Sequence, residues 1–159
     1  MKLIGIDPAF RADGFAVCII DEEKDVLFRR FSSGLIDFVD WLLGEAPDDA
    51  VCVVENSNLN NGVFQYLRKG RVAEQRSKAQ SVGKNQAVSQ IAFDFCKRKW
   101  GKNAHEISPQ SKGKKLTAAY FKLVVNAEKL NLLNYSGTQD ERDALQLALI
   151  AGRKPKYKI

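Results

Sequence analysis

Short apolar runs, separated by polar turns, follow one another along the first third of the chain. The runs at 2–7 (KLIGID), 15–20 (FAVCII) and 26–31 (VLFRRF) are joined by short polar connections, which predicts three strands in an antiparallel meander. The run at 50–55 (AVCVVE) stays apolar until its last residue, which is typical of a strand buried on both faces near the centre of a sheet. A fifth, shorter strand is predicted at 105–108.

Helical periodicity marks four other stretches of the chain. Apolar residues recur every three or four positions over 35–43, 84–99, 116–127 and 138–152. The stretch 56–82 lacks this period and is first polar and rich in Asn, then basic. It is too long for a structureless connection inside a domain, so we expect an extended basic loop or helix with a functional role.

This order of strands and helices predicts an α/β fold in a single domain that spans residues 1–159. We expect a mixed five-stranded sheet, with an antiparallel meander and parallel strands, flanked by helices on both faces. A hydrophobic content of 45% and a charged content of 28% are typical of a globular domain. No apolar run reaches the roughly 20 residues of a membrane span, and no signal-peptide pattern precedes the first strand. Cys18, Cys52 and Cys96 lack metal-ligand spacing, which indicates buried thiols in a cytoplasmic protein without a membrane partner.

Charge is distributed unevenly along the chain, although the net charge is +6. Residues 1–61 hold 5 Lys or Arg against 12 Asp or Glu. By contrast, residues 62–84 hold 6 basic residues against 1 acidic residue, residues 97–115 hold 7 against 1, and the tail 153–158 adds 4 positive charges. One such run alone is as easily explained by a solvated surface. Three of them in a small domain favour a surface that binds a polyanion, of which nucleic acid is the commonest.

Four acidic residues lie where the predicted fold would bring them together. Asp7 and Glu55 end two apolar strands at the carboxyl side, where ligand sites gather in open α/β sheets. Asp140 and Asp143 share one face of the helix predicted over 138–152, and this face continues into apolar residues. If the two strands are neighbours, the four carboxylates converge and repel one another, and hard divalent cations such as Mg²⁺ or Mn²⁺ relieve that repulsion. An acid-rich pocket beside basic surfaces predicts a metal-dependent nuclease.

Each of these acids also has a plainer explanation. The two acids at strand ends belong to residue types that are common in turns and where a strand meets water. Asp140 lies in a first helical turn, where the macrodipole favours an acid, and Thr138 with Glu141 forms the capping box that begins the same helix. Asp143 lies one turn deeper on the apolar face and fits none of these explanations. Together the four acids fit one site better than four coincidences.

Four motifs of the chain resemble, in the same order, those of the RuvC-type Holliday-junction resolvases. The stretch GIDPAFRADGFAV resembles their first strand and turn, and VVEN resembles their strand that ends in Glu. The stretch VGKNQAVSQIA resembles the helix start at which their subunits pack, and QDERDALQLALI resembles their helix with two Asp residues. Ala9 stands where the family usually has Gly, and the stretch between Glu55 and Gly83 is longer than in typical bacterial members, as in phage or other divergent members. The resemblance covers nearly the whole chain.

The resemblance implies a ribonuclease-H-like fold, a homodimer and two Mg²⁺ ions per active site, for which Mn²⁺ can substitute. It also implies a structure-selective endonuclease that resolves four-way DNA junctions by paired symmetric nicks. The family's four acidic positions are matched by Asp7, Glu55, Asp140 and Asp143. Close approach of two subunits would be allowed by Ala87, Gln90 and Ala92. Two alternatives stay open: a related nuclease that acts on RNA–DNA hybrids, flaps or replication forks, and a protein that binds junctions without cleaving them.

The same resemblance marks residues that would contact DNA. The segment SPQSKGKKLTAAYFKLV resembles the family's lysine-bearing turn and helix, so Lys112, and Lys114 or Lys115, are expected to contact the scissile phosphate. In the family an aromatic residue past the Glu inserts between junction bases, and here Phe64 or Tyr66 could serve, unless they pack the loop onto the core. The charge of the basic run at 62–84, rather than the resemblance, marks the other expected DNA contacts: Arg68, Lys69, Arg71, Arg76, Lys78 and Lys84. No nucleotide cofactor is expected, because SVGKNQ lacks the first Gly and the Ser or Thr of a phosphate-binding loop.

Overall fold

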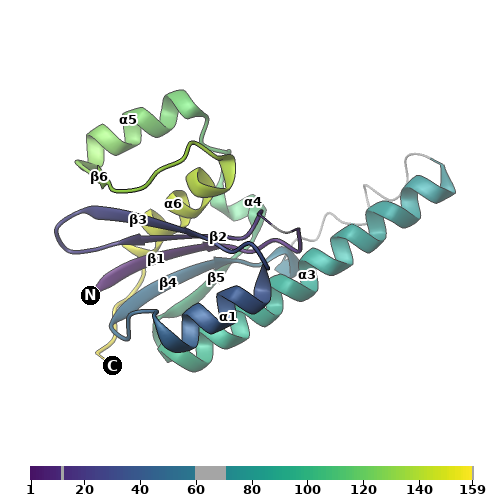
Figure 1. Ribbon diagram of the computed structural model, residues 1–159, viewed down its shortest axis with the longest axis horizontal. Helices are drawn as coiled ribbons and strands as arrows, with labels where there is room; N and C mark the ends of the chain where they lie inside the picture. Colours follow the sequence, from purple (N-terminus) through teal and green to yellow (C-terminus); the bar gives the residue numbers. More distant parts are fainter. Residues whose placement is uncertain (12, 60–70, 159) are drawn as a thin grey trace.

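The protein is built around one mixed β-sheet, shown in Figure 1 as a computed structural model. The structure describes residues 1–11, 13–59 and 71–158. Its strands lie in the order β5-β4-β1-β2-β3-β6, with β1, β2 and β3 antiparallel and the other pairs parallel. The strands are β1 (Lys2–Asp7), β2 (Ala16–Ile20), β3 (Asp25–Arg30), β4 (Ala50–Glu55), β5 (Ala104–Ile107) and β6 (Asn131–Leu132). The predicted α/β class, the mixed sheet and the meander of the first three strands are therefore confirmed.

The sheet has six strands, whereas the sequence predicts five. The additional strand, β6, consists of Asn131 and Leu132, which pair in parallel with Asp25 and Val26 of β3. Asn131 also donates from Nδ2 to Oδ1 of Asp25 over 2.7 Å, which supports this pairing at the edge. Two residues are too few to show an alternation of apolar and polar side chains, so β6 leaves no pattern in the sequence.

Helices cover both faces of the sheet, as predicted (Figure 1). The α-helices are α1 (Leu35–Gly44), α3 (Val72–Trp100), α4 (Pro109–Lys112), α5 (Ala118–Glu128) and α6 (Gln139–Ala151), and the 3₁₀ helices are η1 (Ser57–Leu59) and η2 (Gly101–Asn103). On one face, Phe38 of α1 and Trp100 of α3 are buried against the strands. On the other face, Phe121 of α5 and Leu145 of α6 belong to a second core. Among the helices of the described residues, none is long and apolar enough to cross a membrane.

The central strand β4 is buried on both faces, as its unbroken apolar run predicts. Cys52 and Val54 belong to the core that α1 and α3 cover, whereas Val51 and Val53 pack on the side of α6. The strand lies between β1 and β5, and its last residue, Glu55, is the first that is partly exposed. The three cysteines are free and buried, which confirms the expectation of buried thiols.

The longest helix, α3, begins at Val72, well before the start at residue 84 that the apolar period predicts. Its first turns project beyond the sheet (Figure 1), and because nearly all of their side chains are exposed, no apolar stripe marks them in the sequence. The backbone N–H of Arg71 donates to Oε2 of Glu74 over 3.4 Å, which caps the helix start. The predicted loop or helix over 56–82 is thus helical from Val72 onward. Four expected DNA contacts lie outside the described residues: Phe64, Tyr66, Arg68 and Lys69.

The start of α6 is held by the capping box that the sequence predicts. Oγ1 of Thr138 accepts from the backbone N–H of Glu141 over 3.3 Å. The Glu141 carboxylate, in a residue that is 2% exposed, accepts from the Oγ of Ser136 over 2.7 Å and from its backbone N–H over 3.1 Å. It also accepts from the backbone N–H groups of Gly137 and Thr138 over 3.1 Å and 3.3 Å. This buried carboxylate therefore fixes where α6 begins, and with it the position of the two aspartates in its first turns.

Replacement of Glu141 by Ala is expected to lower the free energy of unfolding by about 2–4 kcal/mol, because several buried donors lose their acceptor at once. The matched control is Glu128→Ala at the exposed end of α5, which should change stability by less than about 0.5 kcal/mol. Urea denaturation followed by circular dichroism measures both. Equal midpoints for the two variants would contradict the structural role of Glu141.

Candidate active site

The carboxyl ends of β1 and β4 bring Asp7 and Glu55 together. The two strands are parallel neighbours, paired in register as far as Ile6 and Val54, so that the two acids follow at adjacent positions. Both acids therefore project from the same edge of the sheet. The sequence predicts that the acids converge only if β1 and β4 are neighbouring strands, and the structure shows that they are.

Asn56 holds the turn that follows Glu55, and sequence reasoning missed this role. The residue is fully buried, and its backbone N–H donates to the carbonyl of Ile107 over 2.8 Å. Its Nδ2 donates to Oε2 of Glu106 over 2.7 Å and to Oε1 of Gln90 over 3.1 Å. These contacts fasten the end of β4 to β5 and to α3, so the backbone that carries Glu55 is held from two sides.

Helix α6 carries Asp140 and Asp143 to the same edge. The helix packs on β1 at Gly5, where its backbone comes so close that a Cβ would lie 2.0 Å from the nearest carbonyl oxygen. Asp143 is 4% exposed, and its Oδ1 accepts from Nε2 of Gln139 over 2.8 Å. Asp140 is partly exposed, and its Oδ2 lies 3.7 Å from Nη2 of Arg11. Asp143 is thus held inside the protein, whereas Asp140 is partly exposed to solvent.

The four acids form one electrostatic unit, which we call the carboxylate cluster: Asp7, Glu55, Asp140 and Asp143. Burial raises the pKa of Asp7 well above its ordinary value, and the charge of Glu55 raises it further. Asp143 and Asp140 add to this increase in pKa, while Lys112 opposes it without cancelling it. The mutual repulsion expected for converging carboxylates is therefore present at Asp7.

Lys112 is the last residue of α4, and it reaches the carboxylate cluster. Its side chain is 5% exposed, and its Nζ forms an ion pair with Oε2 of Glu55 and lies 3.8 Å from Oδ2 of Asp143. Burial alone would lower the pKa of this ammonium, but the charges of the cluster outweigh burial, and the pKa is raised. The other two lysine candidates, Lys114 and Lys115, are exposed.

The segment 112–116, which we call the lysine segment, is fastened to α6 at its start. Nε2 of Gln146 donates to the carbonyl of Lys112 over 2.9 Å and to the carbonyl of Lys114 over 3.3 Å. Because an amide side chain bridges two carbonyls, the backbone on either side of Gly113 is held at a set distance from the helix. Gln146 is therefore part of the site's support.

Two further side chains of α6 hold the end of the lysine segment. Nε2 of Gln139 and Nε of Arg142 donate to the carbonyl of Leu116 over 3.2 Å and 3.0 Å. Gln139 also donates to Asp143, so it links the lysine segment to the carboxylate cluster. Sequence reasoning missed these polar residues. Gln139, Arg142 and Gln146 are spaced by three and then four residues, which places them on one face of the helix. This spacing is the signal in the sequence that could have identified them.

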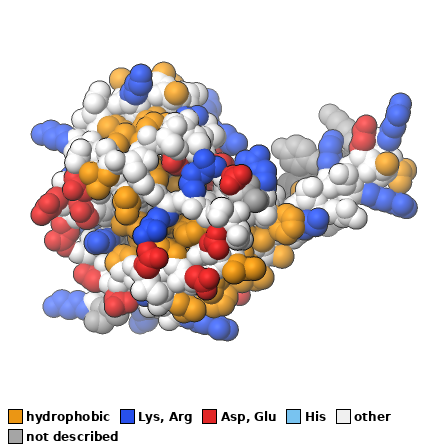
Figure 2. All heavy atoms as spheres, viewed as in Figure 1, with side chains coloured by type: hydrophobic (Ala, Val, Ile, Leu, Met, Phe, Trp, Pro, Cys, Tyr) orange, Lys and Arg blue, Asp and Glu red, His pale blue; other side chains and the backbone are white. Residues whose placement is uncertain are grey.

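The expected DNA contacts that the structure describes outside the lysine segment belong to α3 and the residue before it. Arg71 precedes the helix, and Arg76 and Lys78 lie on its exposed first turns. Figure 2 shows basic side chains along this projecting part of the molecule. Lys84 lies nearer to the cluster, because its Nζ is 4.9 Å from the ring centre of Phe10, in the turn that follows β1. The basic surface thus extends from the turn after β1 outward along α3.

The donors of the carboxylate cluster suit a hard divalent cation, because all of them are carboxylate oxygens. As arranged in the structure, however, no group of three or more Asp, Glu, His or Cys side chains within residues 1–11, 13–59 and 71–158 could hold a metal ion. The ammonium of Lys112 lies against Glu55 and Asp143 instead. The donor atoms of the cluster are thus of the type that binds a divalent metal ion, but in this structure the ammonium of Lys112 provides the positive charge beside them.

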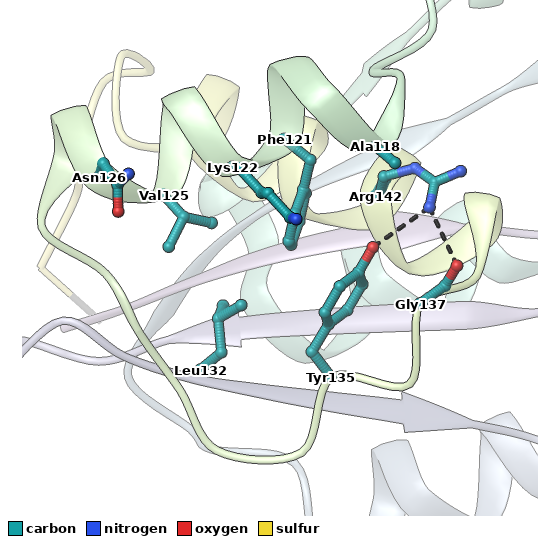
Figure 3. Close-up of a pocket in the computed structure, with 9 residues that line it drawn as sticks. All are labelled: Ala118, Phe121, Lys122, Val125, Asn126, Leu132, Tyr135, Gly137 and Arg142. Atoms are coloured by element: carbon teal, nitrogen blue, oxygen red, sulfur yellow. Dashed lines mark hydrogen bonds between the residues drawn. The ribbon is translucent and has the colours of Figure 1, made fainter.

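A separate hollow lies between α5, β6 and the loop that leads into α6 (Figure 3). Its volume is about 490 Å³, and most of its wall is apolar. The ring of Tyr135 stacks on that of Phe121 with centres 4.3 Å apart, and Arg142 donates to the hydroxyl of Tyr135 over 3.2 Å and to the carbonyl of Gly137 over 3.0 Å. None of its described lining residues belongs to the carboxylate cluster, so the hollow and the cluster are separate features of the fold.

Comparison of the chain with models of protein families, with curated proteins and with solved structures gave no match. What is established is an α/β fold with one mixed six-stranded sheet and helices packed on it. Any function proposed for the chain therefore depends on its own residues and on the motifs that they form.

Proposed function

We propose that this protein is a structure-selective, Mg²⁺-dependent endodeoxyribonuclease that resolves four-way DNA junctions by paired symmetric nicks. The observation that carries the proposal is the carboxylate cluster, in which two strand ends and one helix bring four acids to one edge of the sheet. The motifs that resemble those of RuvC-type resolvases carry these same four acids, which supports a ribonuclease-H-like assignment.

In this proposal the carboxylate cluster holds the metal. Two bound Mg²⁺ ions would activate a water molecule and stabilise the leaving oxygen of the phosphodiester. The chain contributes a rigid frame: Gly5 lets α6 pack directly on β1, and Gln139 orients the carboxylate of Asp143. Lys112 brings a buried positive charge to the same place, where a negatively charged phosphate would need one.

The basic surfaces would bind the DNA backbone on either side of the reacting phosphate. Arg76, Lys78 and Lys84 line the exposed part of α3, and Lys114 and Lys115 are exposed beside the active site. Contacts of this kind position DNA without reading its sequence, and their strength falls as salt rises. They suit an enzyme that recognises the shape of a junction.

Paired nicks at symmetric positions require two active sites, so the proposal includes a homodimer. Of the residues expected to allow close approach of two α3 helices, Ala92 is buried in the protein's own core. Gln90 accepts a hydrogen bond from Asn56 and donates one to Asp94. That expectation was wrong for Ala92. Ala87 and Ile91 are exposed one turn apart on the same helix, so they are the better candidates for the contact.

The test of the substrate class is a panel of DNA structures of matched length and sequence, each incubated with the protein and Mg²⁺. The four-way junction should be nicked at two symmetric positions and faster than linear duplex, flap, fork and RNA–DNA hybrid, because the basic surface extends well beyond one phosphate. Preferred cleavage of the hybrid, flap or fork would assign the protein to a related nuclease activity. Tight binding of the junction without nicking would make it a junction-binding protein.

A further inference from the structure

A lysine side chain occupies the position in the carboxylate cluster where a cation is expected. The Lys112 ammonium forms an ion pair with Glu55 and lies 3.8 Å from Oδ2 of Asp143. Oε2 of Glu55 is buried and has no hydrogen-bond donor among the described residues, so this ion pair is its compensation. Removing a charge from such a buried pair leaves the other charge uncompensated, so the ammonium stabilises the cluster.

Hydrogen bonds from α6 hold the backbone of Lys112, and this fixes the point from which its side chain extends. Gln146 donates to the carbonyl of Lys112 over 2.9 Å. At the other end of the lysine segment, Gln139 and Arg142 both donate to the carbonyl of Leu116. All three donors belong to α6, the helix that carries two acids of the cluster. The lysine and those acids are therefore attached to one rigid element.

The side chain of Lys112 is a long, flexible stem, although the backbone that carries it is held. Four methylene groups separate the ammonium from the held backbone, and a lysine stem has many rotamers of similar energy. The single ammonium lies against two carboxylates, those of Glu55 and Asp143, so it offers one positive charge to two acids. A divalent cation, with twice the charge, would neutralise the cluster more completely.

We propose that Lys112 is a built-in counter-cation, whose ammonium competes with a divalent metal ion for Glu55 and Asp143 and leaves these carboxylates when the metal binds. The inference rests on the proposed function only in taking the carboxylate cluster as the metal site. It has a consequence for regulation: a nearby DNA phosphate would receive the displaced ammonium, so DNA and metal would each tighten the binding of the other. The site would then load metal chiefly when DNA is present.

The test is the affinity for Mn²⁺ without DNA, measured by titration calorimetry on the wild-type protein and on Lys112→Met. The variant keeps an unbranched side chain and loses the competing charge, so it should bind Mn²⁺ at least about tenfold more tightly. Lys122→Met, at an exposed lysine of α5, is the matched control and should bind as the wild type does. Equal or weaker binding by Lys112→Met would overturn the proposal. Lack of binding by all three proteins would overturn the metal site as well, so the two failures are distinguishable.

A second measurement uses the wild-type protein alone and does not depend on the folding of a variant. Acetylation of lysine amines, read by mass spectrometry, should be slow at Lys112 in the metal-free protein because its side chain is 5% exposed. Addition of Mg²⁺ should increase the rate at Lys112 and leave Lys122 unchanged. An unchanged rate at Lys112, under conditions in which calorimetry detects bound metal, would contradict the displacement.

Discussion

Replacement of Asp7 by Asn is expected to lower the rate of junction cleavage by about 10³-fold or more, while binding of the junction is retained. Asn has nearly the shape of Asp, so β1 and its contacts with α6 should persist. What is lost is one carboxylate of the cluster, which lies beside Glu55 at the strand ends and which, in the proposed function, would bind the metal. Single-turnover nicking of a labelled junction gives the rate, and gel-shift titration gives the binding.

The same variant should be more stable than the wild type in metal-free buffer at neutral pH. Burial and the charge of Glu55 raise the pKa of Asp7 above its ordinary value of 3.8. An acid whose pKa is higher in the folded protein contributes stability below its unfolded pKa, and that contribution is lost as pH rises through the folded pKa. The contribution of Asp7 to stability should therefore be lost from about pH 4 upward, and Asp7→Asn should lack this loss. Thermal unfolding in EDTA across this pH range measures the difference.

The matched control for both measurements is Asp40→Asn, which removes an exposed carboxylate from α1. It should cleave and unfold as the wild type does. Cleavage by Asp7→Asn at the wild-type rate would show that Asp7 is not a metal ligand. A variant that is inactive but less stable at neutral pH would contradict the electrostatic account of the cluster.

Replacement of Gly5 by Ala is expected to destabilise the protein by about 3–5 kcal/mol, a large part of the stability of a small domain. A Cβ at this position would lie 2.0 Å from the carbonyl oxygen of Ala144 and 2.3 Å from the backbone nitrogen of Ala148. Both atoms belong to the backbone of α6, which cannot rotate away as a side chain can. The whole helix would have to move off β1, which would open the core and displace two acids of the carboxylate cluster.

Gly44→Ala is the matched control for this substitution. Gly44 is the last residue of α1, and a Cβ there would meet nothing within 4 Å. Because Ala has a higher helix propensity than Gly, the control should be neutral or gain up to about 1 kcal/mol. Urea denaturation followed by circular dichroism compares the two. A Gly5→Ala protein with the midpoint of the wild type would contradict the close packing of α6 on β1.

The strands and acids of the site are predictable because they follow from local patterns. An unbroken apolar run that ends in a single acid, as at Glu55, combines the signal of a central strand with that of its carboxyl end. Asp143 stands out because it lies on an apolar helix face, and its burial agrees with that reasoning. The capping box at Thr138 and Glu141 is predictable for the same reason: its chemistry lies within four residues of the chain.

The support of the site is not predictable in this way, because it depends on contacts between distant parts of the chain. Gln146 and Arg142 are ordinary polar residues on a helix, and only the folded chain brings them to the carbonyl groups of the lysine segment. The burial of Lys112 also depends on the path of α4, a helix too short to show a period. The first turns of α3 are exposed, so they carry no apolar stripe that marks them as helical.

The measurement that most directly tests whether the carboxylate cluster is a metal-dependent nuclease site is nicking of a mobile four-way junction during a titration with Mg²⁺. Each strand carries a label, and the products are mapped to the nucleotide. The account predicts no nicks in EDTA, two symmetric nicks that increase with Mg²⁺ and also form with Mn²⁺, and none with Asp143→Asn. A junction that is bound but stays intact at every metal concentration, or is nicked equally well in EDTA, would contradict it.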